Sequence, residues 1–173
     1  MTRTRPRIAR MLLPVCGPGN METMLTSFQD DRVPEGFLPH FRKSPLTDPW
    51  EPLFSKIGEA SVTIALRARS AHCNGKGLLH GGLISALADN AMGLSLLESL
   101  EMQGIDRARG GATVGLVVDF LASAQIGQWV EFVPRVLKVG SSLGFADCLV
   151  LADNLPVARG SATFRFYRTA PAV

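Results

Sequence analysis

Residues 74–100, NGKGLLHGGLISALADNAMGLSLLESL, decide how the chain folds. A glycine-rich loop leads into residues 83–100, where nearly every side chain is apolar or small. Such a run has no wide polar face, so it predicts a long helix that protein surrounds on most sides. Asp89 and Asn90 interrupt it, and a buried carboxylate is costly unless another group pairs with it or a reaction uses it. Asp89 is therefore the first candidate for a functional residue.

The segments around this helix have the patterns of strands. Residues 59–70 alternate apolar and polar side chains, which is typical of a half-buried strand. Four further runs are rich in valine, phenylalanine and threonine: 113–123, 128–139, 142–151 and 155–168. Short, turn-like separators join these four runs, so each is expected to form an antiparallel hairpin with the next. The sequence predicts an α+β fold in which a five-stranded antiparallel sheet wraps around the central helix.

The residues before the first predicted strand divide into two segments. Residues 1–20 hold four arginines and no acid, so they predict a disordered basic extension, with a targeting peptide as the alternative. Residues 21–58 contain five scattered prolines and predict a strap with a short helix at 21–29. We expect the aromatic residues of this strap to pin it to the core, with Trp50 and Phe54 as candidates for lining a substrate pocket. The predicted domain itself covers residues 59–170.

The composition of the 173 residues excludes several classes of protein. No run of eighteen uncharged apolar residues occurs, so we expect no transmembrane span. The net charge is +3, but four arginines lie in residues 1–20 and the rest carries −1, which argues against a nucleic-acid partner. The three cysteines are widely spaced, which favours a reducing, cytoplasmic compartment. The histidines and cysteines match no zinc-binding spacing, so no metal is expected.

Six residues form a constellation that suits hydrolysis of an activated acyl group: Asn74, His80, Gly81, Gly82, Asp89 and Thr113. The two glycines leave backbone N–H groups uncovered at a helix N-terminus, where the dipole favours negative charge, so they predict an oxyanion hole. Asp89 can activate water as a general base or attack a carbonyl itself. The alternative for Asp89 is a structural carboxylate, and for His80 we expect an orienting role.

The spacing of Gly81 and Asp89 limits how the two can act together. Eight helical residues rise about 12 Å at ~1.5 Å each, which is too far for both groups to act on one carbonyl. A twofold dimer with antiparallel central helices would bring Gly81 of one subunit to Asp89 of the other. The sequence therefore predicts a homodimer with two equivalent sites.

Residues 74–93 resemble the signature of the PaaI-like hotdog-fold acyl-CoA thioesterases. The shared features are an Asn, a His-Gly-Gly turn, and a helical Asp seven residues after the second Gly. The resemblance covers roughly residues 55–168, including the run GATVGLVVDFLASAQIG at 111–127. One departure is that the family often has a proline within the segment 121–125, where this chain has none.

This resemblance implies a hotdog fold, dimers commonly paired into tetramers, and hydrolysis of acyl-CoA thioesters. By position it implies that Asp89 is the catalytic carboxylate, that Gly81 gives the oxyanion-hole amide, and that Thr113 assists the nucleophilic water. Asn74 and His80 match the loop residues that position the carbonyl and the water.

The predicted function is hydrolysis of an aromatic or short/medium-chain acyl-CoA to free acid and CoA. CoA is part of the substrate, so no separate cofactor is expected. The residues expected to bind the substrate are Gly82, Asn90, Trp50 and Phe54. The alternative is a non-catalytic acyl-CoA-binding or regulatory module on the same fold. A hotdog dehydratase or hydratase is less favoured, because those sites normally centre on a catalytic histidine paired with an acid.

Overall fold

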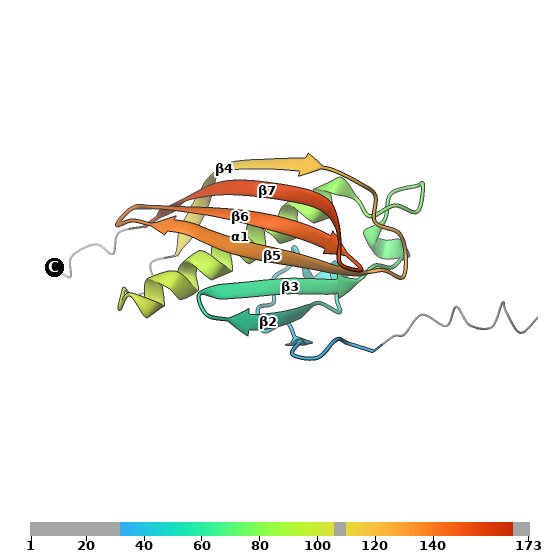
Figure 1. Ribbon diagram of the computed structural model, residues 1–173, viewed down its shortest axis with the longest axis horizontal. Coiled ribbons are helices and arrows are strands. Elements are labelled where there is room, and N and C mark those ends of the chain that lie inside the picture. The colour runs from blue at the N-terminus through green and yellow to red at the C-terminus, as the bar shows by residue number, and fades with distance from the viewer. Residues whose placement is uncertain (1–31, 106–109, 168–173) are drawn as a thin grey trace, which may run out of the picture. The chain divides into compact units, whose positions relative to one another are not determined.

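The computed structural model describes residues 32–105 and 110–167. Its centre is one long helix, α1 (Gly81–Met102), which lies along one face of an antiparallel sheet (Figure 1). Two 3-10 helices, η1 (Asp48–Trp50) and η2 (Ser70–His72), precede it. The strands are β1 (Leu38–Pro39), β2 (Phe54–Gly58), β3 (Ser61–Arg67), β4 (Gly111–Phe120), β5 (Trp129–Val139), β6 (Leu143–Ala152) and β7 (Leu155–Phe166). The predicted extension at 1–20 and short helix at 21–29 lie outside the described residues.

The sheet has seven strands in the order β1-β2-β3-β5-β6-β7-β4, so the predicted number of five is wrong. The two additional strands come from the predicted strap. The prolines of the strap all precede Phe54, and the five residues that follow are too few to give a clear strand pattern. Residues 59 and 60 form the turn between β2 and β3, and Ala60 has a left-handed φ of +50°. The strand predicted from residue 59 therefore begins at Ser61.

β4 lies at an edge of the sheet and pairs with β7, so the predicted hairpin between the first two of the four runs is wrong. The predicted β5–β6 and β6–β7 hairpins are confirmed. The link after β4 is not a tight turn, because its backbone donors and acceptors bond elsewhere. Leu121 N–H donates to Val157 O at 2.9 Å, and Ala124 O accepts from Leu79 N–H at 2.9 Å. The link therefore runs beside the residues that precede α1. It takes the chain from β4, at the edge of the sheet, to β5, which lies beyond β7 and β6 in the strand order.

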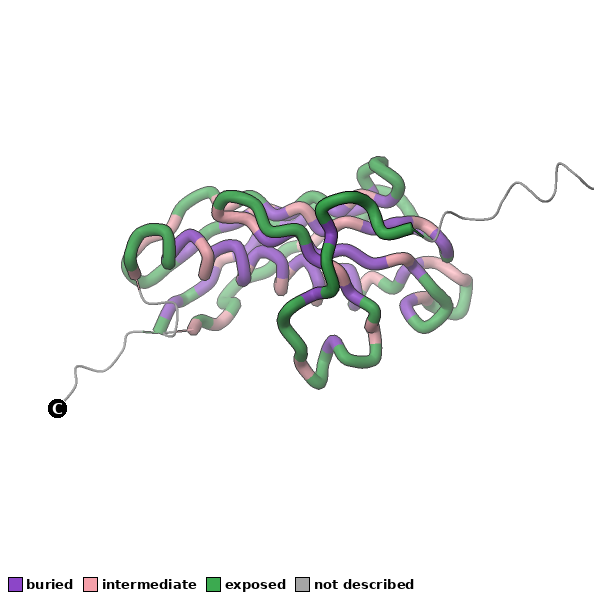
Figure 2. Tube along the Cα trace, turned by 90° about the horizontal axis from the view of Figure 1, so that it is seen from below, coloured by how far each residue is buried: buried purple, intermediate pink, exposed green. Residues whose placement is uncertain are grey.

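The core lies between α1 and the inner face of the sheet. Figure 2 marks the buried residues along the chain in purple. Leu87 and Met92 of α1 are fully buried there, as apolar side chains at helical spacing predict. Ser95 is buried as well, and its hydroxyl accepts from Val62 N–H at 2.9 Å and donates to Ala91 O at 2.8 Å. The polar group inside the core is therefore satisfied.

Protein surrounds α1 less completely than the sequence predicts. One side of the helix is half-buried and open, and it carries Ala86, Asp89, Asn90, Gly93 and Leu97. Asp89 is thus half-buried rather than buried, because the sheet covers only the opposite side of α1. Within residues 32–105 and 110–167, no helix has the length and apolar character needed to cross a membrane.

Candidate active site

Asp89 of α1 and Thr113 of β4 meet on the open side of the helix. The Thr113 Oγ1–H donates a hydrogen bond of 2.6 Å to Asp89 Oδ1. A short bond of this kind is expected when the acceptor is a carboxylate. Oδ2 of Asp89 has no hydrogen bond to any described residue, so it can accept a proton from a water or attack an electrophile.

A cavity of about 360 Å³ adjoins this pair. Asp89 and Asn90 form part of its wall, and the small residues Ala86 and Gly93 leave room beside them. The remaining lining comes from the strap, from Leu97 of α1, from the start of β4 with the residue before it, and from the end of β7: Arg42, Ser44, Leu46, Thr47, Leu97, Gly110, Gly111, Ala112, Thr113, Phe164 and Phe166. The cavity therefore combines a carboxylate and one cation, Arg42, with walls of mixed polar and apolar character.

The His-Gly-Gly turn begins α1 and gives its two glycines different roles. His80 is the N-cap residue, and its Nδ1 accepts the Gly82 N–H at 2.9 Å. This bond places the proton of the neutral ring on Nε2. The Gly81 N–H has no partner among the described residues, as expected for the first amide of a helix. Gly81 is thus the glycine whose amide is available to a developing oxyanion.

Asn74 shapes the loop before the turn. Its Oδ1 accepts the Lys76 N–H at 2.9 Å and the Leu78 N–H at 3.3 Å. Gly77 takes a left-handed φ of +74°, which favours glycine at this point of the loop. The structure therefore places the Asn74 side-chain oxygen inside the turn that leads to His80.

His72 is a residue of this region that the sequence analysis assigned to no site. Its ring Nε2–H donates to Trp50 O at 2.9 Å, and its Nδ1 accepts the Arg69 N–H at 3.2 Å. Its backbone oxygen accepts the His80 N–H at 3.0 Å. Burial lowers the pKa of His72, the bond to Trp50 opposes this, and the Arg69 charge adds to the lowering. A neutral His72 thus ties the strap to the turn that carries Gly81.

The predicted site residues lie in two groups at the two ends of the first half of α1. Asp89, Asn90 and Thr113 adjoin the cavity, whereas His80 and its two glycines lie at the helix start. A Cβ built on Gly81 would lie 3.1 Å from the Phe120 ring, so the far end of β4 touches the helix start. β4 therefore contacts both groups through its two ends.

The two aromatic residues predicted to bind substrate lie away from the Asp89 cavity. The Phe54 ring packs 5.5 Å from the Trp129 ring in a second cluster with Phe37. Trp50 packs against the main core, and its carbonyl binds His72. The strap lines the cavity instead through residues 42–47. No aromatic or periodic signal distinguishes that stretch in the sequence.

The cysteines and histidines of the described ranges do not gather around a possible metal position. No cluster of three or more His, Cys, Asp and Glu side chains occurs within residues 32–105 and 110–167. Cys73 and Cys148 both carry free thiols. Burial raises the pKa of Cys148 to about 12, so this thiol stays protonated and packs as a core side chain.

A single helix held by an antiparallel sheet, with a threonine-bonded carboxylate at a cavity on the open side of the helix, defines a protein of the hotdog class. The comparisons with known proteins identify the family. Residues 76–158 match the thioesterase superfamily model. The "Putative esterase PA0474" of Pseudomonas aeruginosa is 39% identical over 133 residues, which are 76% of this chain and 96% of that protein. The chain belongs to the thioesterase superfamily.

Two further comparisons agree with this assignment. Human acyl-coenzyme A thioesterase 13 is 30% identical over 104 residues, 59% of this chain and 70% of that protein. The solved structure of a mutant of phenylacetic acid degradation protein PaaI from Thermus thermophilus superposes with a TM-score of 0.60. It covers 71% of this chain and 99% of PaaI at 19% identity, so it shows the fold alone. The hotdog fold and the resemblance to a thioesterase family are thereby confirmed.

Proposed function

We propose that the protein is an acyl-CoA thioesterase that hydrolyses an aromatic or short/medium-chain acyl-CoA to the free acid and CoA. The observation that carries the proposal is the hydrogen bond between Thr113 and Asp89 at the edge of a cavity. A carboxylate fixed through one oxygen presents its other oxygen in a constant direction, and such positioning makes a base or a nucleophile effective.

Two routes from Asp89 to the products are open. As a general base, Asp89 takes a proton from water while the water oxygen bonds to the thioester carbon. The C–S bond then breaks, and the proton passes to the departing sulfur of CoA. As a nucleophile, Asp89 bonds to the carbonyl carbon itself and expels the thiolate, and water then hydrolyses the resulting anhydride. In both routes CoA is the leaving thiol, and no separate cofactor is required.

The oxyanion that forms in either route needs a hydrogen-bond donor, and the Gly81 N–H supplies it. Gly81 and Asp89 of one chain are separated by about 12 Å of helix. We therefore assign the Gly81 amide to the partner subunit. Each site is then built from the Asp89 and Thr113 of one chain and the helix start of the other, and the assembly is a homodimer.

The edge strand β4 gives this dimer a specific geometry. Its outer edge carries no strand within the described part of the chain, and it exposes apolar side chains such as Val114 and Phe120. Such an edge is a template for pairing with a second copy. An antiparallel β4–β4 pair that sets Thr113 opposite the partner's Phe120 would bring Asp89 towards the partner's Gly81. This follows because Thr113 contacts Asp89, and Phe120 contacts Gly81, within each chain.

The apolar side chains in the cavity wall, such as Leu97 and Phe164, support an apolar acyl group, and Arg42 supports an anionic portion of the substrate such as CoA. The free thiols Cys73 and Cys148 support a reducing, cytoplasmic location. Pairing of two such dimers into a tetramer is also part of the proposal. No metal, nucleic acid or membrane takes part in it.

Thiol release from a panel of acyl-CoAs, with Asp89→Asn as the control, tests this function. The panel runs from phenylacetyl- and hydroxybenzoyl-CoA to short and medium straight-chain thioesters. We expect turnover of at least one member, and a loss of about a hundredfold or more in Asp89→Asn, which keeps the side-chain size but removes the base. An Asp89→Asn protein with full turnover would overturn the role of Asp89. Saturable acyl-CoA binding without thiol release by the wild type would favour the binding module instead.

A further inference from the structure

The cavity beside Asp89 has a polar end and an apolar end. The polar end is formed by Asp89 with its partner Thr113, and by Asn90. Gly93 and Leu97 follow on the same side of α1, four and eight residues after Asp89. They lie about 6 and 12 Å further along the helix axis than Asp89, because an α-helix rises ~1.5 Å per residue. The cavity thus extends from the carboxylate towards the C-terminal end of α1.

Two phenylalanines of β7 form walls of the apolar end. A Cβ built on Gly93 would lie 3.1 Å from the Phe164 ring, so this ring rests against the backbone of α1. A Cβ built on Gly144 would lie 2.7 Å from the Phe166 ring and 2.8 Å from the Leu96 side chain. Phe166 therefore lies at the level of Leu96, about one helical turn beyond Gly93. Both rings are buried, so they give the apolar end firm walls.

A turn of the strap lines the cavity from the opposite edge of the sheet. β1 and β2 lie at one edge and β4 lies at the other, yet the loop between β1 and β2 lines the same cavity as β4. Hydrogen bonds hold this loop, since the Thr47 N–H donates to Ser44 O at 3.0 Å and the Thr47 hydroxyl donates to the same oxygen at 3.2 Å. The Lys43–Glu51 ion pair, at 2.5 Å, spans the loop. A wall fixed in this way separates ligands by their size.

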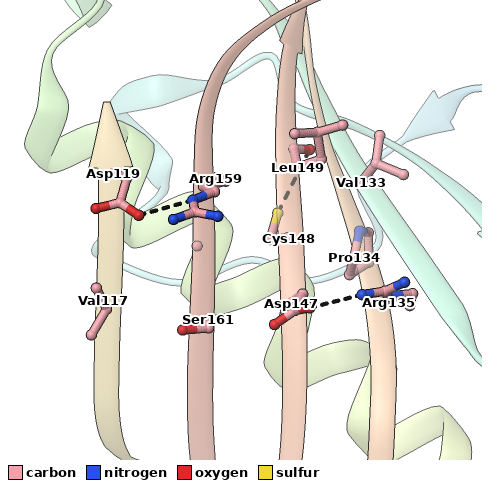
Figure 3. Close-up of a pocket in the computed structure, with 11 residues that line it drawn as sticks. Val117, Asp119, Val133, Pro134, Arg135, Asp147, Cys148, Leu149, Arg159 and Ser161 are labelled. Atoms are coloured by element: carbon pink, nitrogen blue, oxygen red, sulfur yellow. Dashed lines mark hydrogen bonds and ion pairs between the residues drawn. The ribbon is translucent and has the colours of Figure 1, made fainter. Parts of the chain in front are cut away.

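A larger hollow, of about 700 Å³, lies on the outer face of the sheet over β4, β5, β6 and β7 (Figure 3). Two ion pairs line it, Arg135–Asp147 and Arg159–Asp119. The sheet separates this hollow from Asp89, so an acyl group bound there could not present its thioester carbon to the carboxylate. The apolar end of the Asp89 cavity is the better place for an acyl group.

The proposed dimer also leaves the apolar end free for a substrate. In this dimer the partner's helix begins beside Asp89 and runs antiparallel, towards Gly81 of this chain. It therefore does not cover the half of α1 that follows Asp89. An acyl group whose thioester carbon meets Asp89 can extend from there into the apolar end.

The length of the apolar end limits the length of the acyl chain. The last carbon must stop about 4 Å short of Leu97, which is the contact distance between apolar carbons, and about 8 Å then remain from Asp89. A fully extended chain advances about 1.2 Å per bond, so this distance holds about seven bonds beyond the carbonyl carbon. A phenylacetyl group ends near the level of Gly93, and the space it leaves empty forfeits apolar contacts.

We propose that the apolar end is an acyl channel for a straight aliphatic acyl group of about eight carbons, with Leu97 and Phe166 setting the limit on length. The proposal rests on the proposed function, because it takes Asp89 as the group that meets the thioester carbon. Within the acyl channel, Gly93 is the position where the helix leaves room for the chain beside the Phe164 ring.

A binding series tests the acyl channel apart from the reaction. The full-length Asp89→Asn protein keeps the channel and is expected to bind the ligand without hydrolysing it. It is titrated calorimetrically with straight-chain acyl-CoAs of increasing length and with phenylacetyl-CoA. We expect the affinity to rise about fourfold for each added methylene up to about eight carbons, and no further. Phenylacetyl-CoA is expected to bind more weakly than octanoyl-CoA.

Two substitutions in the same Asp89→Asn protein move the length limit in opposite directions. Leu97→Ala withdraws the end wall by about two bonds and is expected to shift the limit to about ten carbons. Gly93→Ala places a Cβ against the Phe164 ring. It is expected to weaken octanoyl-CoA about tenfold but to leave butyryl-CoA, which ends before Gly93, unchanged. Ile57→Ala, at an exposed position on β2 outside the cavity wall, is the control and should leave the whole series unchanged.

The outcomes for the acyl channel and for the reaction are separate. A length limit that Leu97→Ala leaves in place, or tighter binding of phenylacetyl-CoA than of octanoyl-CoA, overturns the channel whether or not the wild type releases thiol. A wild type that releases no thiol, while the binding series still ends at about eight carbons, overturns the hydrolysis and supports the channel.

Discussion

The Thr113 hydroxyl reaches Asp89 from a different element of the fold, and the two oxygens lie 2.6 Å apart. Asp89 is held on a rigid helix, whereas Thr113 lies near the start of a strand at the sheet edge. A backbone irregularity separates Thr113 from Gly115 in the pairing with β7. Bulges of this kind redirect side chains, and this one accompanies a threonine that faces the helix.

Thr113→Val is expected to lower kcat by about a hundredfold, because the carboxylate loses the bond that fixes its direction. Valine has nearly the same shape as threonine, so the fold should be retained. Thr113→Ser keeps the hydroxyl and is expected to retain most of the turnover. Steady-state thiol release from the best acyl-CoA substrate measures both variants. Equal turnover in the valine and serine variants would show that the hydroxyl has no part in catalysis.

His80→Ala is expected to lower the free energy of unfolding by about 1 kcal/mol, because the first turn of α1 loses its cap. His80→Asn supplies another good capping side chain, so its stability and most of its turnover should match the wild type. Chemical denaturation and thiol release measure the two quantities separately. If His80→Asn is stable but as inactive as Asp89→Asn, the imidazole takes part in the chemistry and its role is more than orientation.

Arg42→Ala is expected to raise KM for acyl-CoA about tenfold with little change in kcat, because the exposed cation lines the cavity and makes no ion pair with the described residues. The matched control is the N-acetylcysteamine thioester of the same acyl group, which lacks the phosphates of CoA. Its KM should not change in the variant. An equal rise for both substrates would instead place Arg42 beside the acyl group.

Acidification is expected to weaken the link between the strap and the His-Gly-Gly turn. The pKa of His72 is lowered from 6.5 in the folded protein, chiefly by burial. Below about pH 6.5 the unfolded chain therefore binds a proton at this position that the folded chain does not bind. The free energy of unfolding should fall as the pH falls through this range. Above the range, the contribution of the neutral His72 to stability should be fully present. Denaturation at a series of pH values measures this slope.

His72→Gln isolates the contribution of His72 to that slope. Glutamine can still donate to the Trp50 carbonyl, but it does not titrate. We expect a shallower pH dependence than in the wild type, together with a loss of about 1 kcal/mol at neutral pH from the poorer geometry. Some slope should remain, because burial also lowers the pKa of His40. If the variant has the same slope as the wild type, the titration of His72 does not contribute to the pH dependence of stability.

The sequence was sufficient to predict α1 and the five main strands, because their signals are local. Apolar content along residues 83–100 and alternation along the strands do not depend on distant parts of the chain. The order of the strands in the sheet could not be predicted in this way, because it depends on non-local pairing. The position of β4 beside β7 depends on pairing between residues that are 38 to 55 positions apart in the chain, and the short link at 124–127 resembled a hairpin turn.

The candidate site divides in the same way. The His-Gly-Gly turn and Asp89 could be recognised because their spacing lies within one helix. The contribution of residues 42–47 to the cavity could not, because these residues are brought there only by tertiary packing. The contact of Phe54 with Trp129 could not be foreseen either, because the place of Phe54 in the strap gave no sign of it.

The edge position of β4 also has a consequence for the behaviour of the single chain. A strand whose outer edge has no neighbour and whose side chains are apolar favours irregular association between newly made chains. Regular pairing along β4 would remove that edge from solution in the same step that completes the catalytic site. Assembly would therefore protect the chain from aggregation as well as activate it, and variants that weaken β4 pairing should be lost to precipitation during expression.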